Sequence, residues 1–171
     1  MLITEQFEHT IDYIAEHGIS SIGLIGFIGP LLTSCITTIN LLYLPKYLFT
    51  FIIFFAINIG VNRMLKLWLR QSRPSGGKSI LGEVYQGADE YGMPSAHAQI
   101  LFYSVVYLYF VKENIEWLSV GLGIGALTLY QRWSYRRHTI SQLLVGIFIG
   151  SIIAYIATLT AKYWITDGYF W

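Results

Sequence analysis

The sequence has little charge. Only 12% of its 171 residues are Asp, Glu, Lys or Arg, whereas a soluble domain carries about 25%. Hydrophobic residues make up 54% of the chain. A chain so poor in charge and so rich in apolar side chains is typical of an integral membrane protein. Its formal net charge is +1, so the composition gives no reason to expect a nucleic-acid partner.

Two further absences narrow the class of protein. Cys35 is the only cysteine, which excludes an intrachain disulfide. The first 18 residues contain acids but no Lys or Arg, so we expect no secretory signal peptide, whose start is basic. Within residues 3–17, apolar side chains recur at helical spacing between those acids. This pattern predicts a short amphipathic helix on the membrane surface, with a frayed tail as the alternative.

Long, mostly apolar runs are what the sequence has in abundance. Each is close to the length that a helix needs to cross a bilayer core of about 30 Å. Thirteen tyrosines and five tryptophans suit aromatic belts at the two membrane surfaces. We therefore predict an all-α integral membrane protein, a single domain over residues 1–171, built as a bundle of about five transmembrane helices. The predicted helices are residues 19–40, 47–68, 95–111, 117–133 and 139–163.

Consecutive spans cross a membrane in alternating directions. The loop after the second predicted helix and the turn after the fourth therefore lie on the same face. Three polar clusters, residues 66–74, 92–99 and 132–142, meet on that face, so we expect them to form one site. Three glycines within residues 121–125 lie inside an apolar span with no preceding strand, which favours close helix packing over a nucleotide-binding loop.

The first cluster ends the second predicted helix. Its basic residues recur every three or four positions, which places them in one row on a helix face before Pro74 stops the helix. One explanation is a positive-inside anchor. The other is an anion site, because polar side chains of the row extend back into the apolar zone. Phosphate suits such a row, since Arg binds its oxygens bidentately and Lys as a point charge. The polar residues are Asn58 and Asn62, and the basic ones are Arg63, Lys66, Arg70 and Arg73.

The second cluster is a turn followed at once by a helix start, Gly-Met-Pro-Ser-Ala-His-Ala-Gln. Ser95 is a favourable N-cap residue. The free N–H groups of the first turn, near Ala96, combine with the helix dipole to attract anions. His97 lies in that turn. Alone it would be read as an interface or capping histidine, but two basic clusters on the same face favour a role in phosphate chemistry.

The third cluster contains a second histidine. His138 and Gln142 are four residues apart at the start of a predicted helix, so we expect the amide to hydrogen-bond a ring nitrogen and fix its tautomer. Arg132 precedes the turn and can fold back over the same pocket. Arg136 and Arg137 are expected in solvent or at lipid headgroups.

In order and spacing, the three clusters resemble the signature motifs of the type 2 phosphatidic acid phosphatase (PAP2) superfamily. Two features resemble its dolichyldiphosphatase branch: Gly-Met-Pro-Ser-x-His-x-Gln in the second cluster and His-Thr-x-Ser-Gln in the third. The sequence departs from the usual family pattern at Ala96, Gln131 and Gln142, where glycine, serine and aspartate are common. The matching motifs are Lys66-x6-Arg73-Pro74, Pro94-Ser95-Ala96-His97 and Arg132-x5-His138-x3-Gln142.

The resemblance implies a PAP2-like core around residues 58–142 and a metal-independent phosphatase without a cofactor. His138 would be the nucleophile and form a phosphohistidine, with Gln142 as its orienting residue. His97 would protonate the leaving oxygen and then activate water. The groups that bind phosphoryl oxygens would be Lys66, Arg73, Ser95, the N–H groups near Ala96, and Arg132.

The implied substrate is a polyprenyl, dolichyl-type diphosphate, a lipid that lies among the other membrane lipids. A phosphatase of another lipid phosphate such as phosphatidate, a lipid phosphotransferase, and a catalytically inactive membrane scaffold are the alternatives. Lys and Arg outside the motifs are balanced between the two faces, so orientation follows from the family branch alone. That branch implies a multi-pass protein of the endoplasmic reticulum membrane with a lumen-facing site in a eukaryotic cell. The oligomeric state is left open.

Overall fold

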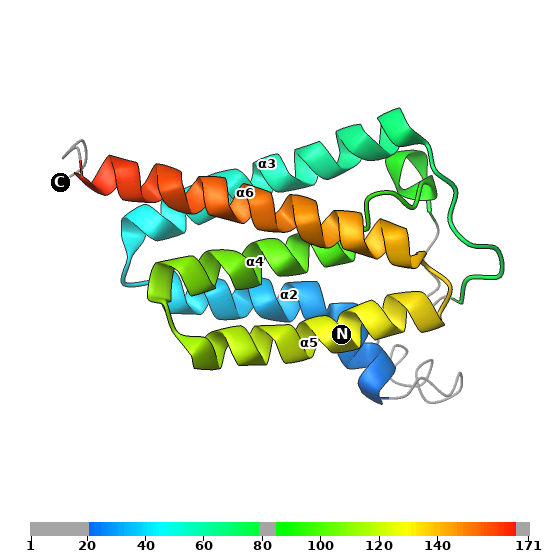
Figure 1. Cartoon of the computed structure of the whole chain (residues 1–171), viewed down its shortest axis with the longest axis horizontal. Coiled ribbons are helices and arrows are strands. Elements are labelled where there is room, and N and C mark those ends of the chain that lie inside the picture. The colour runs from blue at the N-terminus through cyan, green and yellow to red at the C-terminus, as the bar shows by residue number, and fades with distance from the viewer. Residues whose placement is uncertain (1–20, 79–84, 167–171) are drawn as a thin grey trace, which may run out of the picture.

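The computed structural model describes residues 21–78 and 85–166. Five long α-helices of this part of the chain lie side by side, with one short 3-10 helix at an end of the bundle (Figure 1). Their order matches the five predicted spans, and the fold is all-helical as expected. The predicted amphipathic helix at 3–17 lies outside the described residues. The helices are α2 (Ser21–Leu41), α3 (Pro45–Leu69), η1 (Gly87–Glu90), α4 (Ala96–Lys112), α5 (Ile115–Ser134) and α6 (Ile140–Thr166).

Three of the described helices are long and apolar enough to cross a membrane. They comprise Gly23–Leu41 of α2, Pro45–Leu69 of α3 and Ile140–Trp164 of α6. The chain is therefore a membrane protein. α4 has 17 residues and packs against each of the other four long helices, so it is the central helix of the bundle. A helix surrounded by other helices need not present an apolar surface to lipid.

Local signals set the ends of the helices. Pro45 stands at the start of α3, where a missing N–H costs nothing. Arg70 ends the same helix in the left-handed conformation, with φ of 47°. Ser95 is the N-cap of α4, as predicted, and its side chain accepts a hydrogen bond from the Ala98 N–H. Asn114 caps α5 in the same way.

A ladder of buried hydrogen bonds joins α4 to α3. Three α4 side chains spaced four residues apart donate to backbone carbonyls of α3 that already lie within its helix. In an interior without water, each buried donor needs such a partner. The pairs are Gln99 with Asn58 at 2.9 Å, Tyr103 with Phe51 at 2.7 Å, and Tyr107 with Tyr47 at 2.8 Å.

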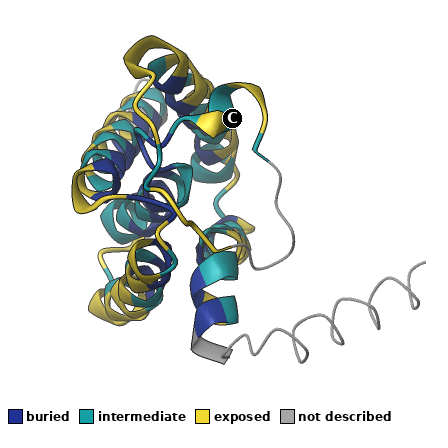
Figure 2. Cartoon of the chain, turned by 90° about the vertical axis from the view of Figure 1, so that its right-hand side faces the viewer, coloured by how far each residue is buried: buried dark blue, intermediate teal, exposed yellow. Residues whose placement is uncertain are grey.

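Glycines allow α5 to approach its neighbours closely. A Cβ at Gly29 of α2 would lie 2.0 Å from Oγ1 of Thr128, and one at Gly121 would lie 2.6 Å from the Val105 side chain. Gly125 also packs on α4, but Gly123 faces open space, so the predicted packing role is wrong for Gly123. Seen along the bundle in Figure 2, the buried surfaces of the helices face one another and the exposed surfaces face outward.

The chain alternates direction from helix to helix. Consequently the end of α3, η1, the start of α4, the end of α5 and the start of α6 all gather at the same end of the bundle, on the right of Figure 1. This arrangement confirms the counting argument from the sequence. It brings the three polar clusters together.

Candidate active site

A cavity of about 390 Å³ opens among these helix ends. Side chains of all three clusters line it, together with two residues of the loop between α3 and α4. Its other wall is apolar and comes mainly from α2. The polar lining is Lys66, Arg73, Asp89, His97, Arg132 and His138, and the apolar wall includes Phe27, Ile28, Pro30, Leu31 and Ile100. A cationic floor beside an apolar wall suits an amphiphile with an anionic head.

His138 lies just before α6 and is 3% exposed. Its Nδ1 is 2.9 Å from the carbonyl oxygen of Gly92, and its Nε2 is 3.1 Å from a terminal nitrogen of Arg73. A carbonyl can only accept and a guanidinium can only donate. Nδ1 therefore carries the proton, and the lone pair is on Nε2, the nitrogen beside the cations of the cavity.

Burial lowers the pKa of His138, and the positive charges of Arg73, Arg132 and Lys66 lower it further, to about 3. The hydrogen bond to the Gly92 carbonyl acts in the opposite direction but is the smaller effect. The imidazole is thus neutral at physiological pH. A histidine nucleophile needs this form, because only the neutral ring has a free lone pair.

We expect His138 to stay neutral while the pH falls from 7.5 to about 4, whereas an ordinary histidine titrates near 6.5. The measurement is NMR of ¹⁵N-labelled histidine rings in detergent micelles, with the His138 signal assigned by its loss in His138→Gln. The direction follows from burial and from three neighbouring cations, which both disfavour the imidazolium. A midpoint between pH 6 and 7 for this ring would contradict the described geometry.

Gln142 does not bond as the sequence predicted. Its Nε2 donates to Oε1 of Gln71 at 3.0 Å and to the carbonyl of Ser72 at 2.9 Å, and its Oε1 accepts from the Thr139 N–H. The prediction that this amide bonds the His138 ring is therefore wrong. The start of α6 turns the Gln142 side chain toward the segment after α3, while the loop before α4 brings the Gly92 carbonyl to the ring.

Gln142 nevertheless supports that carbonyl. A Cβ added to Gly92 would come within 2.7 Å of the amide atoms of Gln142, so the two groups are packed face to face. The Gly92 N–H donates to the Gln71 carbonyl, and the Ser95 N–H donates to the Gln142 carbonyl. Gln142 therefore links the ends of all three motifs, and the group that holds Nδ1 of the imidazole is a backbone carbonyl.

The basic row of the first cluster is divided. Lys66 is 1% exposed and Arg73 is half-buried, and both line the cavity. Arg63 and Arg70 are exposed, so the prediction of one continuous row is wrong. The reason is that α3 ends at Leu69, after which the chain leaves the helix and returns Arg73 to the cavity by a different path.

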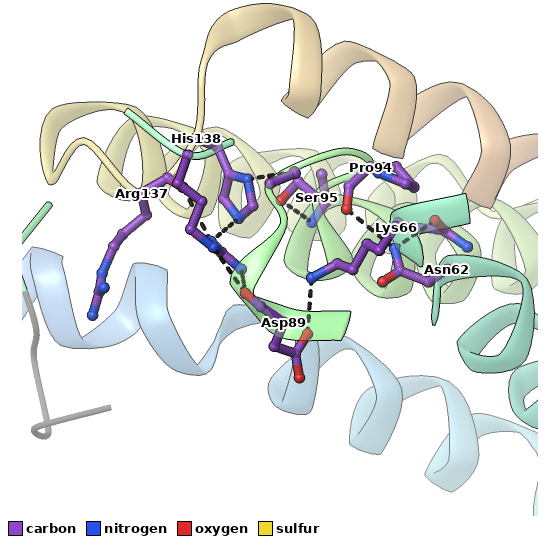
Figure 3. Close-up of polar contacts among 11 residues, drawn as sticks. Asn62, Lys66, Asp89, Pro94, Ser95, Arg137 and His138 are labelled. Carbon is purple, nitrogen blue, oxygen red and sulfur yellow. Dashed lines mark hydrogen bonds and ion pairs between the residues drawn. The ribbon is translucent and has the colours of Figure 1, made fainter. Parts of the chain in front are cut away.

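The second cluster contributes Ala96 and His97 to the cavity wall, whereas Ser95 is fully buried behind it. The structure thus places Ser95 as a helix cap and does not bring its hydroxyl to the cavity. The loop before it is held from α3, because the Asn62 amide donates to the Pro94 carbonyl at 3.3 Å (Figure 3). The same amide donates to Oε1 of Gln99 at 2.8 Å.

Arg132 reaches the cavity from the last turn of α5. It is 1% exposed and donates a hydrogen bond from Nη2 to Nε2 of His97. Its guanidinium also lies 5.0 Å from the centre of the Phe27 ring. The Arg132 guanidinium therefore contacts both His97 and the apolar wall of the cavity.

Three residues in or beside the site were missed or misread from the sequence: Tyr85, Asp89 and Arg137. Arg137 was expected in solvent but is 7% exposed, because its guanidinium stacks at 4.7 Å on the ring of Tyr85. Arg73 stacks on the same ring at 3.9 Å. Asp89 forms an ion pair with Lys66 at 2.8 Å. Only Asp89 carried a signal, as an acid in the loop between two basic clusters.

Comparison with known proteins shows the family of the chain. The family model described as the PAP2 superfamily matches residues 47–166, which include all three clusters. Dolichyldiphosphatase 1 of Homo sapiens is 33% identical over 116 residues, covering 58% of this chain and 46% of that protein. Dolichyldiphosphatase of Saccharomyces cerevisiae is 29% identical over 102 residues, covering 53% of this chain and 42% of that protein. The chain thus matches less than half the length of these relatives. No solved structure matches it significantly.

Proposed function

Since the chain belongs to the PAP2 superfamily, we propose that it is a membrane lipid-diphosphate phosphatase. It hydrolyses a polyprenyl, dolichyl-type diphosphate to the monophosphate through a phosphohistidine on His138. The observation that carries this proposal is the cavity, in which a neutral imidazole and three cationic side chains face an apolar wall. The diphosphate lies against the cations, and the first isoprene units lie against α2.

In the first step, Nε2 of His138 attacks the terminal phosphorus. A nitrogen–phosphorus bond forms and the bridging phosphorus–oxygen bond breaks, so that the lipid leaves as a monophosphate. Lys66, Arg73 and Arg132 stabilise the charge on the equatorial oxygens, which is the main task of a protein in phosphoryl transfer. The Nδ1 proton, shared with the Gly92 carbonyl, stabilises the positive charge that develops on the ring.

In the second step, water attacks the phosphohistidine and releases inorganic phosphate. His97 lines the same cavity, and its Nε2 takes the proton from that water. The phosphate monoester that leaves in the first step is stable as an anion, so it needs no proton from His97. Arg132 must release Nε2 of His97 for this transfer, and the phosphoryl oxygens provide the guanidinium with an alternative partner. His138 also borders a more open hollow of about 610 Å³, through which water can reach it.

A diphosphate suits this nucleophile better than a monophosphate. The leaving group of a diphosphate is a phosphate monoester, whose second pKa is about 6. A lipid monophosphate must expel an alkoxide, whose conjugate acid is close to water with a pKa of about 15.7. Because Gly92 and Gln142 supply no negative charge to His138, its nucleophilicity is limited, and the better leaving group matters more.

The same proposal includes metal independence, because the three cationic side chains supply the charge that a metal ion would otherwise provide. It also includes five membrane crossings and a site on the lumenal side of the endoplasmic reticulum membrane in a eukaryotic cell. α4 would then cross at the centre of the bundle, and α5 would cross at its edge, packed on α2 and α4. The alternating direction of the five described helices supports this count, because each starts at the end of the bundle where the previous one stops.

The test is phosphate release by detergent-purified protein from a panel of lipids. We expect a polyprenyl diphosphate to be cleaved with kcat/KM at least about 10-fold above phosphatidate, a difference of about 1.4 kcal/mol in transition-state binding. EDTA should leave both rates unchanged. His138→Gln protein is the background control. Preference for phosphatidate would indicate the alternative lipid phosphatase, and no release from any lipid would indicate a scaffold.

A further inference from the structure

Asp89 places a carboxylate where the site is built to bind an anion. Its Oδ1 lies 2.8 Å from Nζ of Lys66 (Figure 3), and its side chain lines the same cavity as both histidines. The Lys66 side chain is 1% exposed, whereas that of Asp89 is 51% exposed. A buried ammonium is thus paired with a carboxylate that has solvent on its other side.

The backbone of Asp89 is held separately from its side chain. Nε and Nη2 of Arg73 donate to the Asp89 carbonyl at 3.0 and 2.9 Å. Rotation about the side-chain bonds can therefore carry the carboxylate from Lys66 into solvent while η1 stays in place. A phosphoryl oxygen that binds Lys66 has to replace this carboxylate, because both ligands use the same ammonium.

We propose that Asp89 is a specificity-determining residue that competes with the substrate headgroup for Lys66. This inference rests on the proposed function. A ligand displaces the carboxylate more readily when it brings more negative charge and more contacts. A lipid diphosphate has two phosphoryl groups, whereas phosphatidate, the monophosphate product and inorganic phosphate each have one. Asp89 thereby weakens the binding of monophosphates more than that of the diphosphate, and it favours product release by returning to Lys66.

The test uses Asp89→Asn, which keeps the shape of the side chain and an oxygen for Lys66 but removes the charge. Inorganic phosphate should bind the purified variant about 5- to 10-fold more tightly than wild type by calorimetry, as expected for removing a competing charge-assisted hydrogen bond that is half solvated. The ratio of kcat/KM for diphosphate over phosphatidate should fall by a similar factor. Phosphate should also raise the melting temperature of the variant more than that of wild type.

The matched control is Glu90→Gln, because Glu90 is the next residue of η1, is exposed and does not line the cavity. It should change neither phosphate binding nor the substrate ratio. Unchanged or weaker phosphate binding in Asp89→Asn would overturn the proposal, and so would an equal effect of Glu90→Gln. The calorimetry needs no lipid turnover. If Asp89→Asn binds phosphate more tightly but wild type does not hydrolyse the diphosphate, the proposed function is refuted. The proposal that Asp89 competes with anions for Lys66 would still stand.

Discussion

Replacing His138 with alanine is expected to reduce turnover by at least about 10⁴-fold, which is the scale for removing an enzyme nucleophile. The imidazole is held by Gly92 and Arg73 with its lone pair on Nε2, so the substitution removes the group that is positioned for the attack. Wild type mixed briefly with ³²P-labelled lipid diphosphate and quenched in base should carry acid-labile label on this histidine. His138→Ala should carry none.

The position of the label tests the tautomer as well as the residue. Because Nδ1 donates to the Gly92 carbonyl, the phosphoryl group should be found on Nε2, which mass spectrometry and NMR of the labelled peptide can distinguish from Nδ1. His138→Gln is the control for folding, since its amide can still donate to that carbonyl. Label on any other residue, or on Nδ1, would refute this description of the nucleophile.

The sequence alone predicted the helices and the meeting of the three clusters, because both depend on regular features. Apolar runs of membrane length, Pro45 and the caps at Ser95 and Asn114 act within a few residues of the helix ends that they determine. The alternation of direction follows from the number of helices between two loops. No knowledge of side-chain contacts is needed for either inference.

The hydrogen bonds of the site could not be predicted in this way. Gln142 and His138 have helical spacing, but His138 precedes the first residue of α6, so the spacing does not bring the two side chains together. The ring instead bonds to Gly92, 46 residues away in sequence. Every residue has a backbone carbonyl, so the residue type does not reveal that the Gly92 carbonyl bonds the ring. The pairing of Asp89 with Lys66 could be recognised only once the position of η1 was known.

The largest effect after that of the nucleophile is expected at Arg73 and Lys66. Arg73 contacts Nε2 of His138, and Lys66 lies in the same cavity, so a phosphoryl group on that nitrogen would have both cations beside its oxygens. Arg73→Ala and Lys66→Met should each lower kcat/KM by about 10²-fold or more, as for the loss of an oxyanion donor. Arg73→Lys should recover little, because a lysine cannot span His138 and the Asp89 carbonyl at once.

The chain supplies matched controls for this prediction. Arg63 and Arg70 belong to the same stretch of sequence but are exposed, and the Arg70 side chain donates to the nearby Leu67 carbonyl. Arg63→Ala and Arg70→Ala should therefore change kcat/KM by less than about 3-fold, a difference of about 0.65 kcal/mol. If basic residues here served only to orient the protein in the membrane, all four substitutions would act alike and would reduce insertion instead of turnover. Measuring kcat/KM on equal amounts of folded, membrane-extracted protein separates these two results. Membrane topology depends on the number of positive charges, whereas catalysis depends on the position of each charge in the site.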